Sequence, residues 1–282
     1  MPSYFQAIVL GLLQGLSELF PVSSLGHSVI LPSLLNWQID QASPTFLPFL
    51  VATHAATSLA LFVFFCKDWM KIFRGMWKSL SGGPTDAYGR LGWLLVIGTV
   101  PAGIIGFLLQ KKLEMLFANA ELVTVLLMVN GVVLLLADRI KRGAPHQESA
   151  READVAAAKL SWKQAFGVGL AQSAALLPGI SRAGSAMAGG LFVGLTHEEA
   201  ARFSFLLATP IIAAAAVLKL PSFLHAGSDV IGPALAGAIA AALAAWFSVK
   251  FLTRYFQTNR LSPFGVYCLI AGAGAFAIFI LR

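Results

Sequence analysis

Six apolar segments, each about as long as a membrane is thick, are the feature that most constrains this 282-residue chain. A helix of about 20 apolar residues crosses a hydrocarbon core of ~30 Å. Charged residues make up only 12% of the chain, which is too few to coat a soluble surface of this size. The sequence therefore predicts an all-α polytopic membrane protein and excludes a disordered chain, a fibrous chain and an ordinary cytosolic enzyme. The six predicted spans are 46–65, 91–109, 121–138, 200–219, 230–249 and 263–281.

Two further apolar regions, 4–35 and 163–195, are interrupted in the middle by Pro, Gly and Ser. The interruptions fall at 21–27 and at 178–185, so each apolar half is too short to cross a membrane. Non-helical backbone at membrane depth is tolerated where protein or a water-filled cavity surrounds it. We therefore expect two re-entrant helix–loop–helix hairpins that enter the membrane and return to the same side.

The two interrupted regions also resemble each other in sequence. Gly11-Leu12-Leu13-Gln14 matches Gly169-Leu170-Ala171-Gln172, and a serine follows three residues after a proline in both. Chance similarity between apolar segments is the alternative. We expect a single membrane domain with a first repeat at 1–138, a cytoplasmic connector at 139–162 and a second repeat at 163–282. Because each repeat has three spans, an odd number, the second repeat crosses the membrane in the opposite orientation to the first. Such inverted repeats predict a site near the midplane of the membrane, where the two loops meet.

The basic residues predict the orientation of the chain, whose formal net charge is +7. With the loops 66–90, 139–163 and 250–262 and the turn near Arg202 on one side, that side holds 15 of the 20 lysines and arginines. Basic loops face the cytoplasm, so the first hairpin opens towards the periplasm and the second towards the cytoplasm. No dense basic run with interleaved aromatics appears, which argues against nucleic-acid binding.

Arg182 is a charged residue inside the second interrupted region. An arginine at the bilayer centre costs about 2.5–3.5 kcal/mol on insertion scales, so a partner must compensate for it. The planar guanidinium suits phosphate or carboxylate, and the small residues Ser181, Gly184 and Ser185 would expose backbone N–H groups to an anion. The two interpretations are an anion-binding site and a structural ion pair with Glu18.

Glu18 is the only carboxylate in residues 4–35, and Gln14 stands four residues earlier on the same helical face. Their oxygens are the ligand type that Mg²⁺ or Ca²⁺ prefers, with substrate phosphates completing the coordination. A polar pair that only seals the hairpin is the alternative.

His27 follows Ser24 by three residues in the first interruption. A hydroxyl, an imidazole and the Glu18 carboxylate together permit nucleophilic or general acid–base catalysis. A purely structural histidine is the alternative. His54, in the first predicted span, is expected either to pack or to support the site.

Two motifs carry a resemblance to a known family. Gln14-Gly15-Leu16-Ser17-Glu18 runs into Pro21-Val22-Ser23-Ser24-Leu25-Gly26-His27, and the second motif is Pro178-Gly179-Ile180-Ser181-Arg182. Together they resemble the undecaprenyl-pyrophosphate phosphatases of bacteria, also called bacitracin-resistance phosphatases, over nearly the whole chain. The family's second motif commonly has hydroxyl residues where this chain has Ala183 and Ala186.

The resemblance implies an enzyme that needs Mg²⁺ or Ca²⁺ and removes the terminal phosphate of a polyprenyl pyrophosphate. It implies a homodimer in the inner membrane among membrane lipids, with the site open towards the periplasm, recycling the lipid carrier of cell-wall synthesis. The catalytic residues expected on this basis are Glu18, Ser24, His27 and Arg182. The expected substrate-binding residues are Gln14, Ser23, Gly179, Ser181, Gly184 and Ser185, and the expected metal ligands are Gln14 and Glu18.

A transporter or flippase of polyprenyl phosphate is the main alternative, because inverted repeats with broken helices are common in transporters. A carrier has no need of Ser24 beside His27. A structural or channel-like protein is a third possibility, but it leaves Glu18, His27 and Arg182 without a reason to lie in apolar hairpins.

Overall fold

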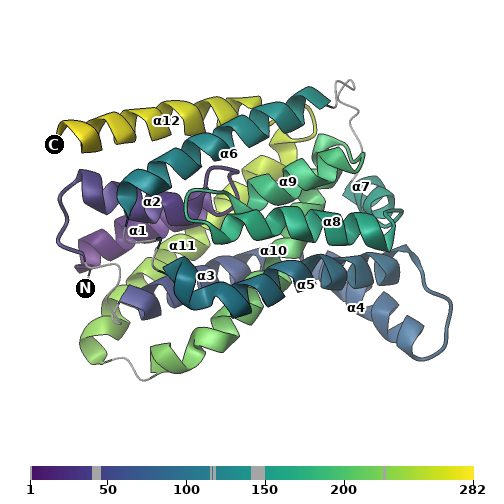
Figure 1. The fold of residues 1–282 in the computed structure, drawn as a ribbon. Helices are drawn as coiled ribbons and strands as arrows, with labels where there is room; N and C mark the ends of the chain where they lie inside the picture. The colour runs from purple at the N-terminus through teal and green to yellow at the C-terminus, as the bar shows by residue number, and fades with distance from the viewer. Residues whose placement is uncertain (1, 40–45, 115, 117–118, 141–149, 225–226) are drawn as a thin grey trace.

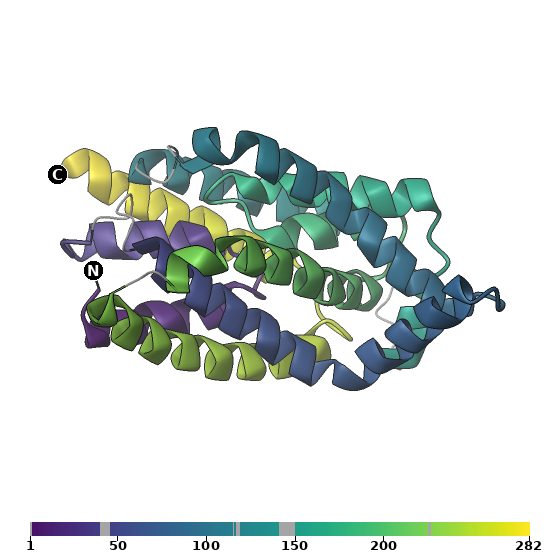
Figure 2. The same cartoon turned by 90° about the horizontal axis from the view of Figure 1, so that it is seen from below.

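The chain folds into a bundle of roughly parallel and antiparallel helices (Figure 1). The computed structural model describes residues 2–39, 46–114, 116, 119–140, 150–224 and 227–282, and no strand occurs among them. Both termini lie at the same end of the bundle (Figures 1 and 2). The helices are α1 (Tyr4–Ser17), α2 (Ser24–Leu34), α3 (Phe46–Phe64), α4 (Cys66–Leu80), α5 (Ala87–Glu114), α6 (Ala120–Ile140), α7 (Ala150–Ala157), α8 (Trp162–Ser173), the 3₁₀ turn η2 (Ala174–Leu176), α9 (Arg182–Phe192), α10 (His197–Leu224), α11 (Ser228–Tyr255) and α12 (Ser262–Leu281).

Among the described residues, four helices are long and apolar enough to cross a membrane, and this makes the chain an integral membrane protein. They cover Ala87–Leu109, Ala120–Arg139, Val230–Tyr255 and Ser262–Leu281, where four of the six spans are predicted. A fifth candidate is the pair formed by Pro48–Phe64 and Cys66–Leu80, which bends by 80°. The predicted span 200–219 lies within α10, where the side chains of residues 216 and 218–224 fall outside the described part.

The connection expected at 66–90 is mostly helical, because residues 66–80 form helix α4, where the sequence shows apolar residues among basic ones in an interfacial amphipathic pattern. The helix is amphipathic: Trp69, Ile72 and Gly75 are buried, whereas Trp77 is 75% exposed. Gly75 packs against Gly89 at the start of α5, so the basic segment is held on the bundle by its apolar stripe. The connector expected at 139–162 contains helix α7, and residues 141–149 lie outside the described part.

In the two interrupted regions, the helices are interrupted where the Pro, Gly and Ser residues predict a loop. Each contains a pair of helices of 11 to 14 residues, α1 with α2 and α8 with α9. Helices α1 and α8 begin with the same capping box, formed by Ser3 with Gln6 and by Ser161 with Gln164. The path of these pairs through a membrane stays a prediction.

The first and second halves of the chain are packed reciprocally through glycine contacts. Helix α1 lies against α11, and a Cβ added at Gly11 would come within 2.1 Å of the Gly237 carbonyl oxygen. Helix α8 lies against α5, and a Cβ added at Gly169 would come within 2.2 Å of the Gly98 carbonyl oxygen. Helices in lipid associate through such close backbone packing. Each interrupted region is therefore fixed by a long helix of the other half.

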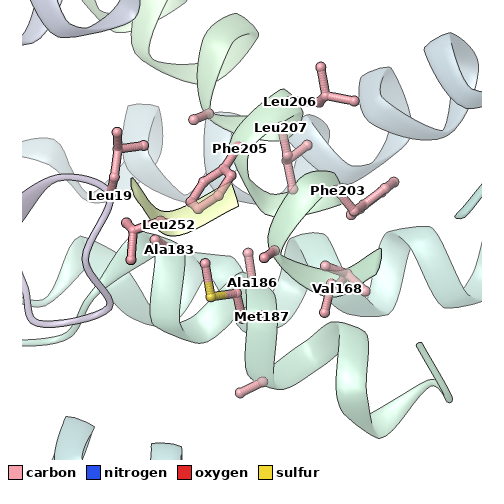
Figure 3. Packing of buried hydrophobic residues seen from close by; sticks show 14 of the residues in the cluster. Leu19, Val168, Ala183, Ala186, Met187, Phe203, Phe205, Leu206, Leu207 and Leu252 are labelled. Atoms are coloured by element: carbon pink, nitrogen blue, oxygen red, sulfur yellow. The ribbon is translucent and has the colours of Figure 1, made fainter. Parts of the chain in front are cut away.

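A buried apolar cluster supports the loops from one side (Figure 3). Small residues of α9 let α10 approach closely, and the phenyl ring of Phe205 is fully buried. The cluster continues into α8, α11, the first loop and other helices of the bundle, and it anchors the helix that begins with Arg182. The residues labelled in the figure are Leu19, Val168, Ala183, Ala186, Met187, Phe203, Phe205, Leu206, Leu207 and Leu252.

Helix α8 allows a matched test of this packing. Alanine is a better helix former than glycine by about 1 kcal/mol, so Gly167→Ala, at an exposed position with open space around it, should preserve or raise the melting temperature in detergent. Gly169→Ala should lower the melting temperature, because its methyl group would collide with the Gly98 carbonyl. Equal melting temperatures for the two variants would contradict the α8–α5 contact.

Candidate active site

The two loops that interrupt the hairpins contact each other inside the bundle. A Cβ added at Gly26, in the first turn of α2, would lie 3.1 Å from the Cα of Gly179 in the second loop. Gly179 has a φ of +106°, and a Cβ there would lie 2.5 Å from the Val123 carbonyl oxygen. This backbone conformation and this close approach both require glycine. The contact brings together two motifs that lie more than 150 residues apart.

Asn130 of α6 bridges the two loops through its side-chain amide. Its Nδ2 donates to the Pro21 carbonyl oxygen at 3.0 Å, and its Oδ1 accepts from the Ser181 backbone N–H at 3.0 Å. The side chain is 1% exposed. A single buried amide therefore satisfies one backbone group from each loop and fixes their distance.

Helices α2 and α9, which follow the two loops, both begin with a serine cap. Ser23 caps α2 by accepting from the Gly26 backbone N–H, and Ser181 caps α9 by accepting from the Gly184 backbone N–H. The first residue of each helix is then one of the predicted catalytic residues, Ser24 in α2 and Arg182 in α9. Ser23 has a φ of +70°, which is rare for a residue with a Cβ and marks strain of the kind often found at functional sites.

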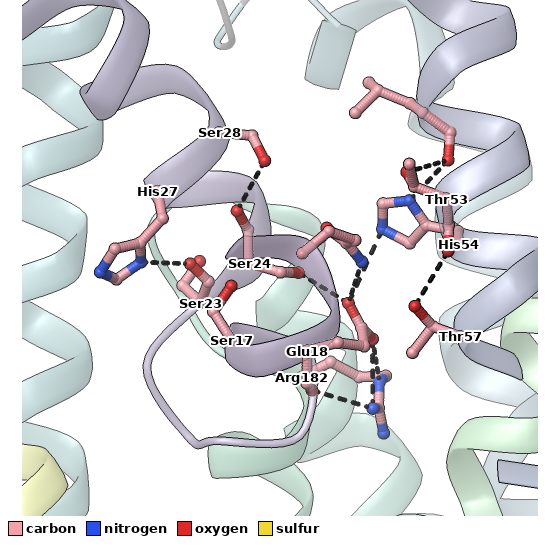
Figure 4. A network of polar contacts seen from close by, with 12 residues as sticks. Ser17, Glu18, Ser23, Ser24, His27, Ser28, Thr53, His54, Thr57 and Arg182 are labelled. Atoms are coloured by element: carbon pink, nitrogen blue, oxygen red, sulfur yellow. Dashed lines mark hydrogen bonds and ion pairs between the residues drawn. The ribbon is translucent and has the colours of Figure 1, made fainter. Parts of the chain in front are cut away.

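The carboxylate of Glu18, at the C-cap of α1, is the centre of the polar network (Figure 4). Its Oε2 accepts from the Ser24 hydroxyl at 2.6 Å and from Gln14 Nε2 at 2.9 Å. Its Oε1 accepts from Nε and Nη2 of Arg182, both at 3.2 Å. Glu18 is 6% exposed, so these four donors replace water around a buried charge.

Arg182 is held by both ends of its guanidinium. Besides the Glu18 carboxylate, Nη2 donates to the Glu18 carbonyl oxygen and Nη1 to the Ser204 carbonyl oxygen, both at 3.3 Å. The predicted ion pair with Glu18 is thus present. Arg182 also lines the cavity described next, so the ion pair leaves an anion-binding role open.

A cavity of about 290 Å³ adjoins this network. Glu18, Ser24 and Arg182 lie on its wall, and most of the remaining wall is apolar. A mostly apolar cavity with a few convergent polar groups is typical of a binding site for an amphipathic ligand. The full lining is Glu18, Ser23, Ser24, Leu25, Leu50, Val51, His54, Ala102, Gln172, Ala175, Leu176, Ile180, Ser181, Arg182, Ile211, Ile212 and Ala215.

His54 of α3 lies at this wall, on the side of Glu18 away from Arg182 (Figure 4). Its Nε2 is 3.7 Å from Glu18 Oε2, and its Nδ1 is 2.8 Å from the Leu50 carbonyl oxygen. Of the two positions expected for His54 from the sequence, it therefore occupies the one beside the site.

His27 points away from Glu18 and does not line the cavity (Figure 4). Its Nδ1 is 2.7 Å from the Ser23 carbonyl oxygen and its Nε2 is 2.8 Å from the Tyr267 hydroxyl of α12. The two rings stack at 5.7 Å between centroids. The structure thus brings Ser24 to Glu18 but directs His27 towards α12, and the catalytic role predicted for His27 stays a prediction.

The other predicted binding residues are divided between the cavity wall and the backbone behind it. Ser23 and Ser181 line the cavity, while Gly179, Gly184 and Ser185 are not part of its wall. Gly184 provides the capped N–H of α9, and Ser185 is 5% exposed in the same turn.

Asn130 and Gln172 are two residues of this region that the sequence does not identify as part of the site. Asn130 is a lone amide in a span that is otherwise apolar through its middle, which is a signal that could have indicated a buried polar contact. Gln172 stands at the repeat position of Gln14 and lies on the cavity wall, whereas Gln14 does not line the cavity.

Residues 7–274 match the family model described as bacitracin resistance protein BacA. The chain belongs to this family. A relative named undecaprenyl-diphosphatase 2 from Burkholderia orbicola (strain AU 1054) is 49% identical over 276 residues, which is 98% of this chain and 96% of the relative. A relative named undecaprenyl-diphosphatase 1 from Burkholderia pseudomallei (strain K96243) is 48% identical over 94% of this chain and 93% of the relative.

A more distant member, named undecaprenyl-diphosphatase, comes from Acidiphilium cryptum (strain JF-5). It is 44% identical over 273 residues, covering 95% of each chain. The expected family is therefore confirmed, and the match includes both loops, the network around Glu18 and the cavity of this BacA-family chain.

Replacing the bridging amide should separate the two loops of the site. In Asn130→Leu the Ser181 N–H and the Pro21 carbonyl lose their partner, which should lower the free energy of unfolding by about 1–3 kcal/mol for each group left unsatisfied. The measurement is the melting temperature in detergent, with Val125→Leu, at an exposed position of the same helix α6, as the control. An unchanged melting temperature for Asn130→Leu would show that the bridge does not hold the loops.

Proposed function

We propose that the protein is an integral membrane phosphatase that hydrolyses undecaprenyl pyrophosphate to the monophosphate and inorganic phosphate. The observation that carries the proposal is the 2.6 Å hydrogen bond from the Ser24 hydroxyl to the buried Glu18 carboxylate, beside Arg182 and on the wall of an apolar cavity. The printed names of the relatives support the substrate and the reaction. Such an enzyme recycles the lipid carrier of cell-wall synthesis, and bacitracin resistance is typical of its family.

The first step is attack of Ser24 Oγ on the terminal phosphorus. The hydroxyl already donates its hydrogen to Glu18 Oε2, so the carboxylate receives the proton as the O–P bond forms. The bond from this phosphorus to the bridging oxygen breaks, and the lipid monophosphate leaves. Phosphoryl transfer depends mainly on positioning and on neutralising the phosphoryl oxygens, and Arg182 supplies the fixed positive charge.

The second step returns the enzyme to its starting state. Water attacks the phosphorus of the phosphoserine at residue 24, the Ser24 Oγ–P bond breaks, and inorganic phosphate is released. The proton held by Glu18 returns to the Ser24 oxygen, so the hydroxyl and the carboxylate are both restored. Attack by water in a single step, with Glu18 as the general base, uses the same residues without the serine intermediate.

A divalent cation, Mg²⁺ or Ca²⁺, is part of the proposal. Gln14 Oε1 is buried and accepts no hydrogen bond from the described residues, while Nε2 of the same amide donates to the Glu18 carboxylate. Gln14 Oε1 fits a hard cation, whereas Glu18 would have to exchange one of its four donors for the ion. No cluster of three acidic, histidine or cysteine side chains that could hold a metal occurs in the described part of the chain. The ion would therefore be held jointly with the substrate's phosphates and would supply charge neutralisation there.

The membrane arrangement proposed for this enzyme has six spans and two re-entrant hairpins in an inverted repeat. It lies in the inner membrane with the site open to the periplasm, and it forms a homodimer. The basic residues support this orientation, because the side with α4 and α7 holds most of them. The cavity accommodates a head group and the start of a polyprenyl chain, so the rest of the tail would lie in the bilayer.

Transport of a polyprenyl phosphate is the second candidate, favoured by the reciprocal packing of the two halves. A transporter needs a site that releases its cargo unchanged to either side. The hydroxyl–carboxylate pair has no purpose in such a cycle, and for this reason we prefer hydrolysis.

The deciding assay is phosphate release from a C15 or C55 prenyl pyrophosphate by the purified protein in detergent. Activity should require Mg²⁺ or Ca²⁺ and be lost in EDTA. Glu18→Gln and Arg182→Ala should each lower kcat by about 10²–10³-fold, because they remove the proton acceptor and the fixed positive charge. Ser33→Ala, on the outer turn of α2, is the control. Folded protein that releases no phosphate with either metal would refute the enzyme and make lipid transport the next assay.

The role of His27 can be separated from that of a general base. Its ring supports the Ser23 carbonyl, so we expect His27→Ala to lower kcat and His27→Asn, which keeps a donor near that oxygen, to recover most of the loss. The pH dependence of kcat should be the same in His27→Asn as in the parent. Equal losses in both variants would instead support the proton-transfer role predicted from the sequence.

A further inference from the structure

Gln172 is a buried polar residue on the cavity wall that the proposed mechanism does not use. It lies in the last turn of α8, is 2% exposed and shares the cavity with Ser24 and Arg182. Neither its Nε2 nor its Oε1 has a hydrogen-bond partner among the described residues. A buried amide without partners is costly and uncommon in folded proteins, so this one calls for an explanation.

The equivalent residue in the first half shows why this amide is left unpaired. Gln14 occupies the same place in the matching Gly-Leu-x-Gln sequence, and its Nε2 donates to Glu18, four residues later. Residues four apart face each other on a helix. The residue four positions after Gln172 is Leu176, whose side chain has no hydrogen-bond acceptor. The glutamine of the first half, Gln14, thus donates to the carboxylate, whereas the equivalent glutamine of the second half, Gln172, is available to a ligand.

We infer that Gln172 is a substrate-binding residue whose Nε2 donates to a phosphate oxygen of the pyrophosphate. The inference rests on the proposed function and extends it to the second half of the chain. The lipid tail cannot satisfy an amide, so the head group is the part of the substrate that fits this position.

The composition of the polar wall supports a phosphate rather than a cationic ligand. The Glu18 carboxylate already accepts from four donors. The hydroxyls of Ser23 and Ser181 accept from the backbone N–H groups of Gly26 and Gly184. Arg182 and Gln172 therefore provide donors from the second half of the chain. A charge-assisted hydrogen bond to a phosphate is among the stronger contacts that an amide N–H can make.

The test compares Gln172→Met with Ser173→Ala. Methionine keeps the length of the side chain and removes both unpaired atoms, so the melting temperature in detergent should be retained or raised. The neighbouring Ser173 hydroxyl donates to the Gly169 carbonyl oxygen within α8 and does not line the cavity. Gln172→Leu is the second variant should the first not fold.

For Gln172→Met we expect KM for a C15 prenyl pyrophosphate to rise roughly tenfold or more with a nearly unchanged kcat, because the contact serves the bound substrate and the transition state alike. Ser173→Ala should keep the parent KM. A cavity water as the sole partner of Gln172 predicts an unchanged KM in both variants, and that result would overturn the inference.

Binding is measured separately from hydrolysis, as the increase in melting temperature caused by inorganic pyrophosphate with Mg²⁺. The parent and Ser173→Ala should show this increase, and Gln172→Met should lose most of it. Pyrophosphate binding that depends on Gln172 in a protein with no phosphatase activity would refute the proposed function and leave the inference intact. Normal hydrolysis with equal pyrophosphate binding in the parent and in Gln172→Met would refute the inference and leave the proposed function intact.

Discussion

The structure depends on one buried ion pair, in which Glu18 from the first loop accepts from Arg182 of the second. The two residues are 164 positions apart and are 6% and 13% exposed. Removing one partner of such a pair leaves an uncompensated buried charge and costs about 3–5 kcal/mol. The chain must therefore bring its two interrupted regions together before either charge can be buried. The bridge at Asn130 and the close approach of Gly26 to Gly179 follow from the same requirement, because loops held by this pair must pack at backbone distance.

The ion pair also determines how the site can work. With Arg182 on Oε1 of Glu18, the proton of Ser24 and the amide of Gln14 are directed to Oε2. In the proposed mechanism, Oε2 receives the proton that Ser24 loses. A phosphate that binds Arg182 would compete with Glu18 for the same guanidinium.

Much of this could be predicted from the sequence, because spans, breaks and buried charges are local patterns. Hydropathy and the Pro-Gly-Ser interruptions predict the spans and the short helices, and the cost of a charge in lipid predicts that Arg182 needs a partner such as Glu18. Directions around a helix were harder to predict. His27 is rotated by only about 60° from Ser24 on an ideal helix, yet its ring lies against Tyr267, a contact between residues 240 apart. The run 67–78 has an amphipathic pattern in the sequence, but its packing against α5 depends on residues distant in the chain and could not be read from that pattern.

The two halves of the site share a backbone design and differ in the chemistry placed on it. The serine match in the sequence pairs Ser24 with Ser181, but the caps pair Ser23 with Ser181, so Ser24 and Arg182 occupy equivalent first positions of α2 and α9. Both helices begin at the same cavity, and the N-terminus of a helix favours negative charge. One of the two similar turns thus presents the proposed nucleophile and the other a cation, each at the positive end of a helix. In the proposed mechanism, two turns of one backbone design serve attack on phosphorus because they carry different side chains.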